Sequence, residues 1–197
     1  MVLTRTEEAK LFIDINTTQR GVPAALLLDI KQLAQQESTL EQSLRSLFDK
    51  LNMDSASPLT GKLSSNKSVT GKLSRVTFNR ALGPIINGSV LGDLTDSQKY
   101  KLILNYLNAF DAEILDKALL VKSAFFEAIF AMFDLIVENS IAVAKDAKQN
   151  SIQKIIRPLA KLNYNGTGGK SLLDKKSIAL LMQSTLKSKR SIGEEML

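Results

Sequence analysis

The sequence predicts a mainly α-helical fold, an irregular bundle of about seven or eight helices with one short β-hairpin near residues 59–74. Apolar residues recur every three or four positions through most of the chain, as on the buried face of a helix. Serine or threonine, followed three residues later by glutamate or glutamine, marks two helix starts. A chain of 197 residues can form one domain, which we place at residues 1–190, with a frayed tail at residues 191–197.

The N-terminal residues predict a helix with an acidic first turn. Thr4 or Thr6 can cap this helix, and Glu7 and Glu8 follow at once. Its buried face would be formed by Ala9, Phe12 and Ile13. Leu11, Ile13 and Ile15 also alternate with polar residues, so a strand is an open alternative.

A second helix is predicted after Pro23, because proline fits the first turn of a helix, where its missing N–H costs nothing. Its buried stripe would be formed by Leu26, Ile30, Leu33 and Ala34. Residues 16–21 then form a polar corner between the two helices.

A third helix starts at a capping-box pattern formed by Ser38 and Glu41. One continuous apolar stripe then leads to a helix end near Asn52 and consists of Leu40, Leu44, Leu47, Phe48 and Leu51. Residues 54–58 are interpreted as a polar connection, because the proline at 58 holds the preceding residue extended.

The next segment is basic, since no acidic residue occurs between Asp54 and Asp93. It contains Lys62, Lys67, Lys72, Arg75 and Arg80. A near-repeat, residues 61–65 and 71–75, borders a region where apolar and polar residues roughly alternate, which predicts the short hairpin. Ser74 can cap a following helix that Pro84 should kink or end.

Four further helical segments fill the second half of the chain. Thr95 and Gln98 form the second capping box, and a break is predicted at residues 116–122. Residues 123 to about 145 are the most apolar segment and should form the central helix of the bundle. A stripe over residues 152–162 is bent by Pro158, and a last helix covers about residues 171–187.

The composition argues against several classes of protein. The chain has no cysteine and no histidine, which excludes a disulfide framework, a thiolate zinc site and the commonest catalytic groups. No serine lies in a nucleophile-elbow pattern, so we expect no enzyme activity and no cofactor. Residues 124–137 contain two acidic residues and are shorter than the roughly 20 apolar residues of a membrane span. Without a secretory leader, we expect a cytoplasmic protein.

Two patterns resemble chemical sites but have simpler interpretations. Glu127, Asp134 and Glu138 line one edge of the predicted central helix and could hold a divalent metal, yet an ion-paired or solvated edge explains them, so we predict no metal site. Residues 163–171 end in Gly-Lys-Ser but lack the glycine spacing of a Walker loop. We interpret them as a linker before the last helix.

Two groups of residues are candidates for phosphate binding. The net charge of +6 and the pI of about 9.5 permit contact with nucleic acid. The basic segment could follow a duplex backbone through Lys62, Lys67, Lys72, Arg75 and Arg80. The polar corner could hold phosphate through Asn16, Thr17, Gln19 and Arg20. The alternatives are a solvated lysine-rich surface and a set of helix caps, respectively.

The polar corner also carries a resemblance to a known family. Residues 12–22 resemble a segment of the DGQHR-domain proteins, which include the DNA-phosphorothioation-associated DndB regulators, and the matching residues are Phe12, Asp14, Ile15, Asn16, Thr17, Gln19 and Val22. Shorter likenesses follow at residues 51–63, 77–82 and 103–106. The Asp-Gly-Gln-His-Arg signature itself is absent, so the chain resembles the C-terminal part of such a protein. The spacing of Asn16, Gln19 and Arg20 is distantly similar to the Asn-x-Gln-Arg motif of ParB-type proteins, with one residue inserted.

Two functions follow as hypotheses. The resemblance implies a non-catalytic, DNA-associated regulatory or accessory module that contacts the phosphates of duplex DNA through the basic segment. The alternative is a helical protein–protein interaction or oligomerisation module that binds no nucleic acid. Its partner would be the missing N-terminal half of a DGQHR-type protein or a second copy in a homodimer. This alternative predicts an unusually apolar exposed surface.

Overall fold

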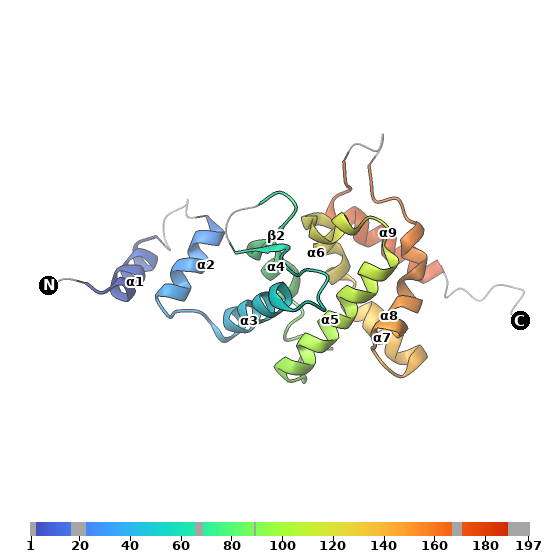
Figure 1. Cartoon of the computed structure of the whole chain (residues 1–197), viewed down its shortest axis with the longest axis horizontal. Coiled ribbons are helices and arrows are strands. Elements are labelled where there is room, and N and C mark those ends of the chain that lie inside the picture. The colour runs from blue at the N-terminus through green and yellow to red at the C-terminus, as the bar shows by residue number, and fades with distance from the viewer. Residues whose placement is uncertain (1–2, 17–22, 66–68, 89, 167–170, 189–197) are drawn as a thin grey trace, which may run out of the picture.

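The computed structural model of the chain describes residues 3–16, 23–65, 69–88, 90–166 and 171–188. In these residues the fold is mainly α-helical, as predicted, with nine α-helices, two 3-10 helices and one pair of strands. The elements are α1 (Arg5–Asn16), α2 (Ala24–Leu33), α3 (Thr39–Met53), β1 (Leu63–Ser64), β2 (Leu73–Ser74), α4 (Arg75–Leu82), α5 (Asp96–Glu113), η1 (Lys117–Val121), α6 (Ser123–Ala131), α7 (Phe133–Ala144), α8 (Gln149–Ile156), η2 (Arg157–Lys161) and α9 (Lys175–Ser188). Figure 1 shows α1 and α2 at one end of the molecule and α7, α8 and α9 towards the other.

The first segment is a helix, which decides against the alternative of a strand. The backbone N–H of Thr4 donates to Glu7 Oε2 at 2.7 Å, and the backbone N–H of Glu7 donates to Thr4 Oγ1 at 3.3 Å. This reciprocal pair is a capping box, and it satisfies two amides that the first helical turn would otherwise leave open. Thr4, not Thr6, is therefore the residue that starts α1.

Both capping boxes predicted from the sequence are present. Ser38 Oγ accepts from the backbone N–H of Glu41 at 3.2 Å, and Glu41 Oε2 accepts from that of Ser38 at 2.8 Å. Thr95 and Gln98 make the same two bonds at 3.4 and 2.9 Å. These caps fix where α3 and α5 begin, and the apolar stripe predicted for α3 faces the core.

The main core is built around Tyr106 of α5. Its ring centroid lies 5.0 Å from that of Phe110, 5.6 Å from Phe130 and 4.8 Å from Phe133. Tilted contacts at this range are favourable for aromatic pairs beyond the area that they bury. The segment predicted as most apolar therefore does lie at the centre, packed on α5.

The predicted single central helix over residues 123–145 is wrong, because the chain breaks at Met132 into α6 and α7. Met132 has φ −99° and ψ 2°, and its N–H bonds the carbonyl of Ile129 three residues back instead of one four residues back. The hydroxyl of Tyr106 also donates to the Ile129 carbonyl, at 2.6 Å. A long-range hydrogen bond thus stabilises a break that helical periodicity gives no sign of.

The strand pair predicted near residues 59–74 exists, but its direction differs from that of a hairpin. β1 and β2 pair in parallel, with Leu63 opposite Leu73 and Ser64 opposite Ser74. A parallel pair needs a connection that returns the chain to its starting side, and the alternation of apolar and polar residues does not reveal strand direction. The two halves of the near-repeat therefore lie side by side in the same orientation.

Half of the predicted buried stripe of α2 is wrong. Ala34 is fully buried, whereas Leu26 and Leu33 are 46% and 63% exposed. The reason is that α2 packs on α1 through a small cluster of Ala9, Ile13, Ala34 and the half-buried Ile30, separate from the main core. The outer side of the α1–α2 pair has no further layer over it among the described residues.

The proline and C-terminal predictions differ in detail. α4 ends at Leu82, two residues before Pro84, and α8 gives way to the 3-10 helix η2, which contains Pro158. α9 begins at Lys175, later than predicted, and Asp174 Oδ1 accepts from the backbone N–H of Lys176 and Ser177. No helix within the described ranges is long and apolar enough to cross a membrane. The predicted frayed tail lies outside the described residues.

Candidate functional site

Of the polar corner predicted to hold phosphate, the structure describes only the backbone of its first residue. Asn16 is the last residue of α1, and its side chain lies outside the description. Thr17, Gln19 and Arg20 also lie outside the described residues, as does Lys67 of the basic segment. The geometry of the candidate site therefore concerns Lys62, Lys72, Arg75 and Arg80.

Arg75 is a structural residue in this fold. It is 5% exposed, and its guanidinium forms an ion pair with Asp29 of α2. A buried guanidinium needs a counter-charge, because moving a charge out of water costs several kcal/mol. Asp29 supplies that counter-charge from 46 residues away in the sequence. Arg75 therefore joins α2 to α4 and does not face solvent as the prediction required.

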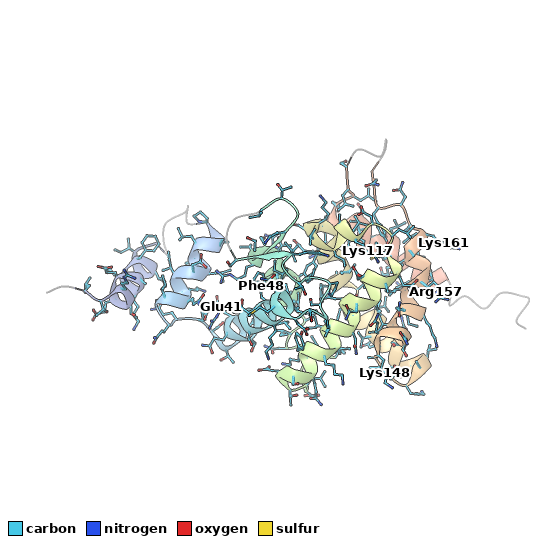
Figure 2. All side chains as sticks on the ribbon, viewed as in Figure 1. Glu41, Phe48, Lys117, Lys148, Arg157 and Lys161 are labelled. Atoms are coloured by element: carbon cyan, nitrogen blue, oxygen red, sulfur yellow. The ribbon has the colours of Figure 1, made fainter. Side chains whose placement is uncertain are left out.

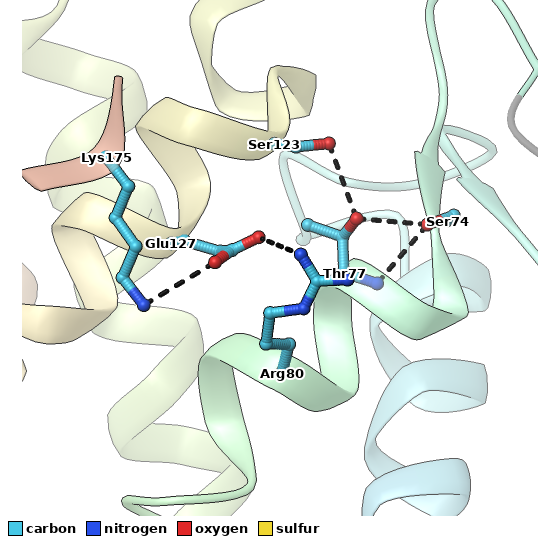
Figure 3. A network of polar contacts seen from close by, with 6 residues as sticks. All are labelled: Ser74, Thr77, Arg80, Ser123, Glu127 and Lys175. Carbon is cyan, nitrogen blue, oxygen red and sulfur yellow. Dashed lines mark hydrogen bonds and ion pairs between the residues drawn. The ribbon is translucent and has the colours of Figure 1, made fainter. Parts of the chain in front are cut away.

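Arg80 belongs to a polar network at the junction of α4, α6 and α9 (Figure 3). Its Nη1 lies 3.2 Å from Glu127 Oε1, and Lys175 Nζ lies 3.5 Å from Glu127 Oε2. In the same view Thr77 Oγ1 lies 3.1 Å from Ser74 Oγ and 3.3 Å from Ser123 Oγ. Arg80 remains 61% exposed, so one face of its guanidinium stays in solvent.

The carboxylates predicted to share one helical edge do not form a common site. Glu127 is buried between its two cations, and Glu138 is exposed on α7. The break at Met132 separates Glu127 from Asp134, so their sequence offset no longer places them along one line. Among the described residues no group of three acidic side chains could hold a metal ion. The ion-paired alternative is confirmed for Glu127.

The predicted linker around residues 163–171 gives no anion site at a helix start. Its residues 167–170 lie outside the description, and Asn165 pairs with Leu172 in an antiparallel bridge. The first amides of α9 are capped by the Asp174 carboxylate. Hydrogen bonds from the Ser177 hydroxyl and backbone N–H lower the pKa of Asp174. A carboxylate already occupies the position that an anion would need.

Lys62 and Lys72 are different, because they lie next to each other on the paired repeats. Each repeat reads Thr-Gly-Lys-Leu-Ser, at residues 60–64 and 70–74. The backbone N–H of Leu73 donates to the carbonyl of Lys62 at 2.9 Å, so the pairing extends to the lysines. Leu63 and Leu73 are buried in the main core. Since side chains alternate along a strand, the lysines belong to the opposite, outer face.

The glycine of each repeat sets the same turn before the lysine. Gly61 has φ +67° and Gly71 has φ +79°, which is the left-handed region that side chains with a Cβ rarely adopt. A Cβ would meet no atom within 4 Å at either position, so the requirement is one of backbone conformation, not of space. Both lysines therefore enter their strands from equivalent turns.

This arrangement places two lysines on neighbouring strands. The backbones of neighbouring strands lie about 5 Å apart, so the two side chains start from adjacent positions, and like charges on neighbouring strands disfavour the pairing. No ion pair within the described ranges involves Lys62 or Lys72, whereas Lys117, Lys148 and Arg157 elsewhere lie 3.8 to 3.9 Å from carboxylates. Figure 2 shows those three cations over the half of the molecule that carries α5 and α8.

The carboxylate that most closely precedes Lys62 in the sequence, Asp54, already has hydrogen-bond partners. Asp54 accepts hydrogen bonds from the Tyr100 hydroxyl and from the backbone N–H of Ala56, and these lower its pKa. Burial, with the Asp54 hydrogen bond and charge, raises the pKa of Tyr100 to about 12. Both groups thus stay in the charge states that favour their bond, and Asp54 ties α3 to α5.

Exposed apolar side chains gather at the other candidate surface, the α1–α2 hairpin. Six of the twelve large apolar side chains that are exposed in the described residues belong to it or directly precede it: Leu3, Leu11, Phe12, Ile15, Leu26 and Leu33. The other six, among them Met53 and Leu115, are scattered over the rest of the fold. Half of the exposed large apolar side chains in the described residues therefore belong to this part of the fold or directly precede it.

A groove lies between α2, α3 and α4. It has a volume of about 350 Å³, and its apolar lining includes Leu27, Leu28, Leu40, Leu44 and Val76. Lys31 and Arg80 also line it, and Lys31 Nζ lies 2.7 Å from Glu41 Oε1. Sequence periodicity missed this feature, because it assigns α2 one buried face and cannot say what covers it.

Comparison with known proteins adds no assignment. No family model matches the chain, and no curated protein or solved structure matches it.

Proposed function

We propose that this chain is a non-catalytic helical accessory module that docks a protein partner through the outer face of its α1–α2 hairpin. The observation that carries this proposal is the grouping of exposed leucines on two helices with a small core of their own. Leu26 and Leu33 lie two helical turns apart on one side of α2, a spacing that forms a ridge. Large exposed apolar patches mark interaction sites, and these two helices, which pack on each other, each carry exposed apolar side chains.

The resemblance to DGQHR-domain proteins suggests a first partner to test, a domain that carries the Asp-Gly-Gln-His-Arg signature. The second partner to test is another copy of this chain, since apolar surfaces of identical chains can pair about a two-fold axis. The hairpin suits a protein partner better than nucleic acid, because the two cations of α1, Arg5 and Lys10, are outnumbered by its acidic residues, which include Glu7 and Glu8. Acidic side chains repel a phosphate backbone.

Sedimentation velocity tests the proposal in two arms, with the chain alone over a concentration series and with an added signature domain. The matched variants are Leu26→Asp with Leu33→Asp in the hairpin and Met53→Asp with Leu115→Asp outside it. We expect association in one arm, weakened at least about tenfold by the hairpin pair, or about 1.4 kcal/mol. A strict monomer that binds no signature domain contradicts the proposal, as does equal weakening by both pairs.

A DNA-associated role is a second proposal, favoured by Lys62 and Lys72, which form no ion pair among the described residues, and by the net charge of +6. Titration against duplex DNA at two salt concentrations tests it. We expect Lys62→Ala with Lys72→Ala to lower the slope of log K against log salt by about 2, since each phosphate contact contributes about one unit. Lys176→Ala with Lys187→Ala removes the same charge from α9 and serves as the control. Undetectable binding at low salt contradicts this role.

A further inference from the structure

We propose that Lys62 and Lys72 form one discrete site for a single phosphate group, held between the two Thr-Gly-Lys-Leu-Ser repeats. The site deepens the DNA-associated proposal, on which it rests for the source of the phosphate, but its chemistry requires only a phosphate. The observation behind it is that an identical pentapeptide occurs twice and pairs with itself in parallel register.

The backbone geometry gives the two lysines corresponding positions, although Lys62 is half-buried and Lys72 is exposed. Leu63 pairs with Leu73 and Ser64 with Ser74, and the Leu73 N–H bonds the Lys62 carbonyl, so Lys62 and Lys72 lie directly before the paired strands. The leucines that follow them enter the core, and the alternation of side chains directs both lysines to the other face, where Lys72 is exposed and Lys62 half-buried. Because the pairing is parallel and in register, two ammonium groups can approach one ligand from the same side.

The charge distribution favours an anion at these two lysines. Like charges directly opposite each other on neighbouring strands destabilise the pairing, and natural sheets usually place opposite charges there. The described carboxylates around this segment are engaged elsewhere, Asp29 with Arg75 and Asp54 with Tyr100. A phosphate oxygen between the two ammonium groups would turn the repulsion into two charge-assisted hydrogen bonds.

The backbone gives the site a fixed frame. Positive φ at Gly61 and Gly71 sets the same turn before each lysine, and Leu63 and Leu73 anchor the residues after them. Only the lysine side chains are left to order when the ligand binds, so the entropic cost is confined to two side chains. A loose row of surface lysines would lack this frame.

Amide NMR of the full chain, titrated with inorganic phosphate and separately with a short DNA duplex, tests the site. We expect saturable shifts at Gly61 and Gly71 in at least one arm, and the arm that responds identifies the source. Lys62→Ala and Lys72→Ala should each weaken binding about tenfold, and the double variant little further, because the two lysines act on one ligand. Lys62→Arg with Lys72→Arg should retain binding.

The outcomes separate this site from the wider proposals. Shifts with inorganic phosphate but not with duplex contradict the DNA-associated role and support the site. Duplex binding in which the two single substitutions are additive, or are matched by Lys176→Ala with Lys187→Ala, indicates diffuse attraction and overturns the site. Absence of saturable shifts in both arms overturns it as well. Unchanged helical circular dichroism in the double variant shows that any loss is not unfolding.

Discussion

Arg75 shows most clearly why single residues resist assignment from sequence. It lies in a segment without acidic neighbours, which favours a solvent-facing cation, yet the fold brings Asp29 to it from another helix. Local patterns, by contrast, were sufficient for the caps, because Ser38, Glu41, Thr95 and Gln98 act within one turn. The capping residues could thus be predicted, whereas the long-range ion pairs could not.

The pair formed by Arg75 and Asp29 should matter for stability. We expect Asp29→Asn to lower the free energy of unfolding by about 2 to 3 kcal/mol, because it leaves the buried guanidinium without its counter-charge. Asp111→Asn, which removes a carboxylate 3.9 Å from Lys117 at the surface, should change it by less than about 1 kcal/mol. Urea unfolding followed by circular dichroism measures both. Equal effects of the two substitutions would contradict the structural role of Arg75.

Tyr106 gives a second prediction at this scale. Its hydroxyl donates to the Ile129 carbonyl at the break between α6 and α7. Tyr106→Phe keeps the aromatic packing and should lower the free energy of unfolding by about 1 kcal/mol, the net value of one buried hydrogen bond. Thermal unfolding of the two proteins measures this difference in stability. An unchanged stability would show that the carbonyl is satisfied by the N–H of Met132 alone.

At the scale of elements, most helices could be predicted, but how the elements pack on one another could not. The capping boxes predicted where α3 and α5 begin and the apolar stripe predicted the buried face of α3, but these patterns did not separate α6 from α7 or show that β1 and β2 run parallel. Periodicity reports which side of a helix is apolar and carries no information on what covers that side. For this reason the sequence did not predict that Leu26 and Leu33 of α2 are exposed.

The capping box of α3 allows a clean test. Ser38→Ala should lower the free energy of unfolding by about 1 kcal/mol, because the N–H of Glu41 loses its acceptor. Ser46→Ala, at an exposed position in the same helix, should change it by a few tenths or raise it slightly, since alanine is the better helix former. Chemical denaturation of both variants gives the comparison. A loss for Ser46→Ala as large as that for Ser38→Ala would argue against the cap.

The α1–α2 hairpin should be the less stable part of the fold when the chain is alone. Its buried apolar residues are Ala9, Ile13 and Ala34, against the large aromatic core of the remaining helices. Local opening costs least where few apolar contacts must be broken. We therefore expect amides of α1 and α2 to exchange with solvent faster than those of α5 and α8. Similar protection in both regions would contradict a separate, weakly held hairpin.

For the whole molecule, the tyrosines predict how stability depends on pH. Burial is the first cause that raises the pKa of Tyr100, Tyr106 and Tyr164 above the ordinary value of 10.0, to about 12 for Tyr100. A raised pKa means that the folded state keeps the proton longer, so the stability is complete below pH 10 and is lost as the pH rises through the folded values. Tyrosinate absorbance and circular dichroism should therefore change together above pH 10. Ionisation of a tyrosine near pH 10 with intact helix signal would contradict this.

The overall organisation puts the two candidate surfaces on different parts of the molecule. The paired repeats precede α4, while the apolar face belongs to α1 and α2 at the N-terminal end (Figure 1). The sequence predicted the basic segment but overestimated its free cations, since Arg75 and Arg80 are engaged with carboxylates. It predicted an apolar surface in general terms, and only the packing of α2 located it.

The central proposal is that the α1–α2 hairpin meets a protein partner. Hydrogen–deuterium exchange of the chain alone and at saturation with the partner found by sedimentation tests this most directly. We expect the protection of backbone amides to increase chiefly in residues 5–16 and 24–33, and we expect Leu26→Asp with Leu33→Asp to abolish the increase. Protection confined to other helices, with α1 and α2 unchanged at saturation, would contradict it.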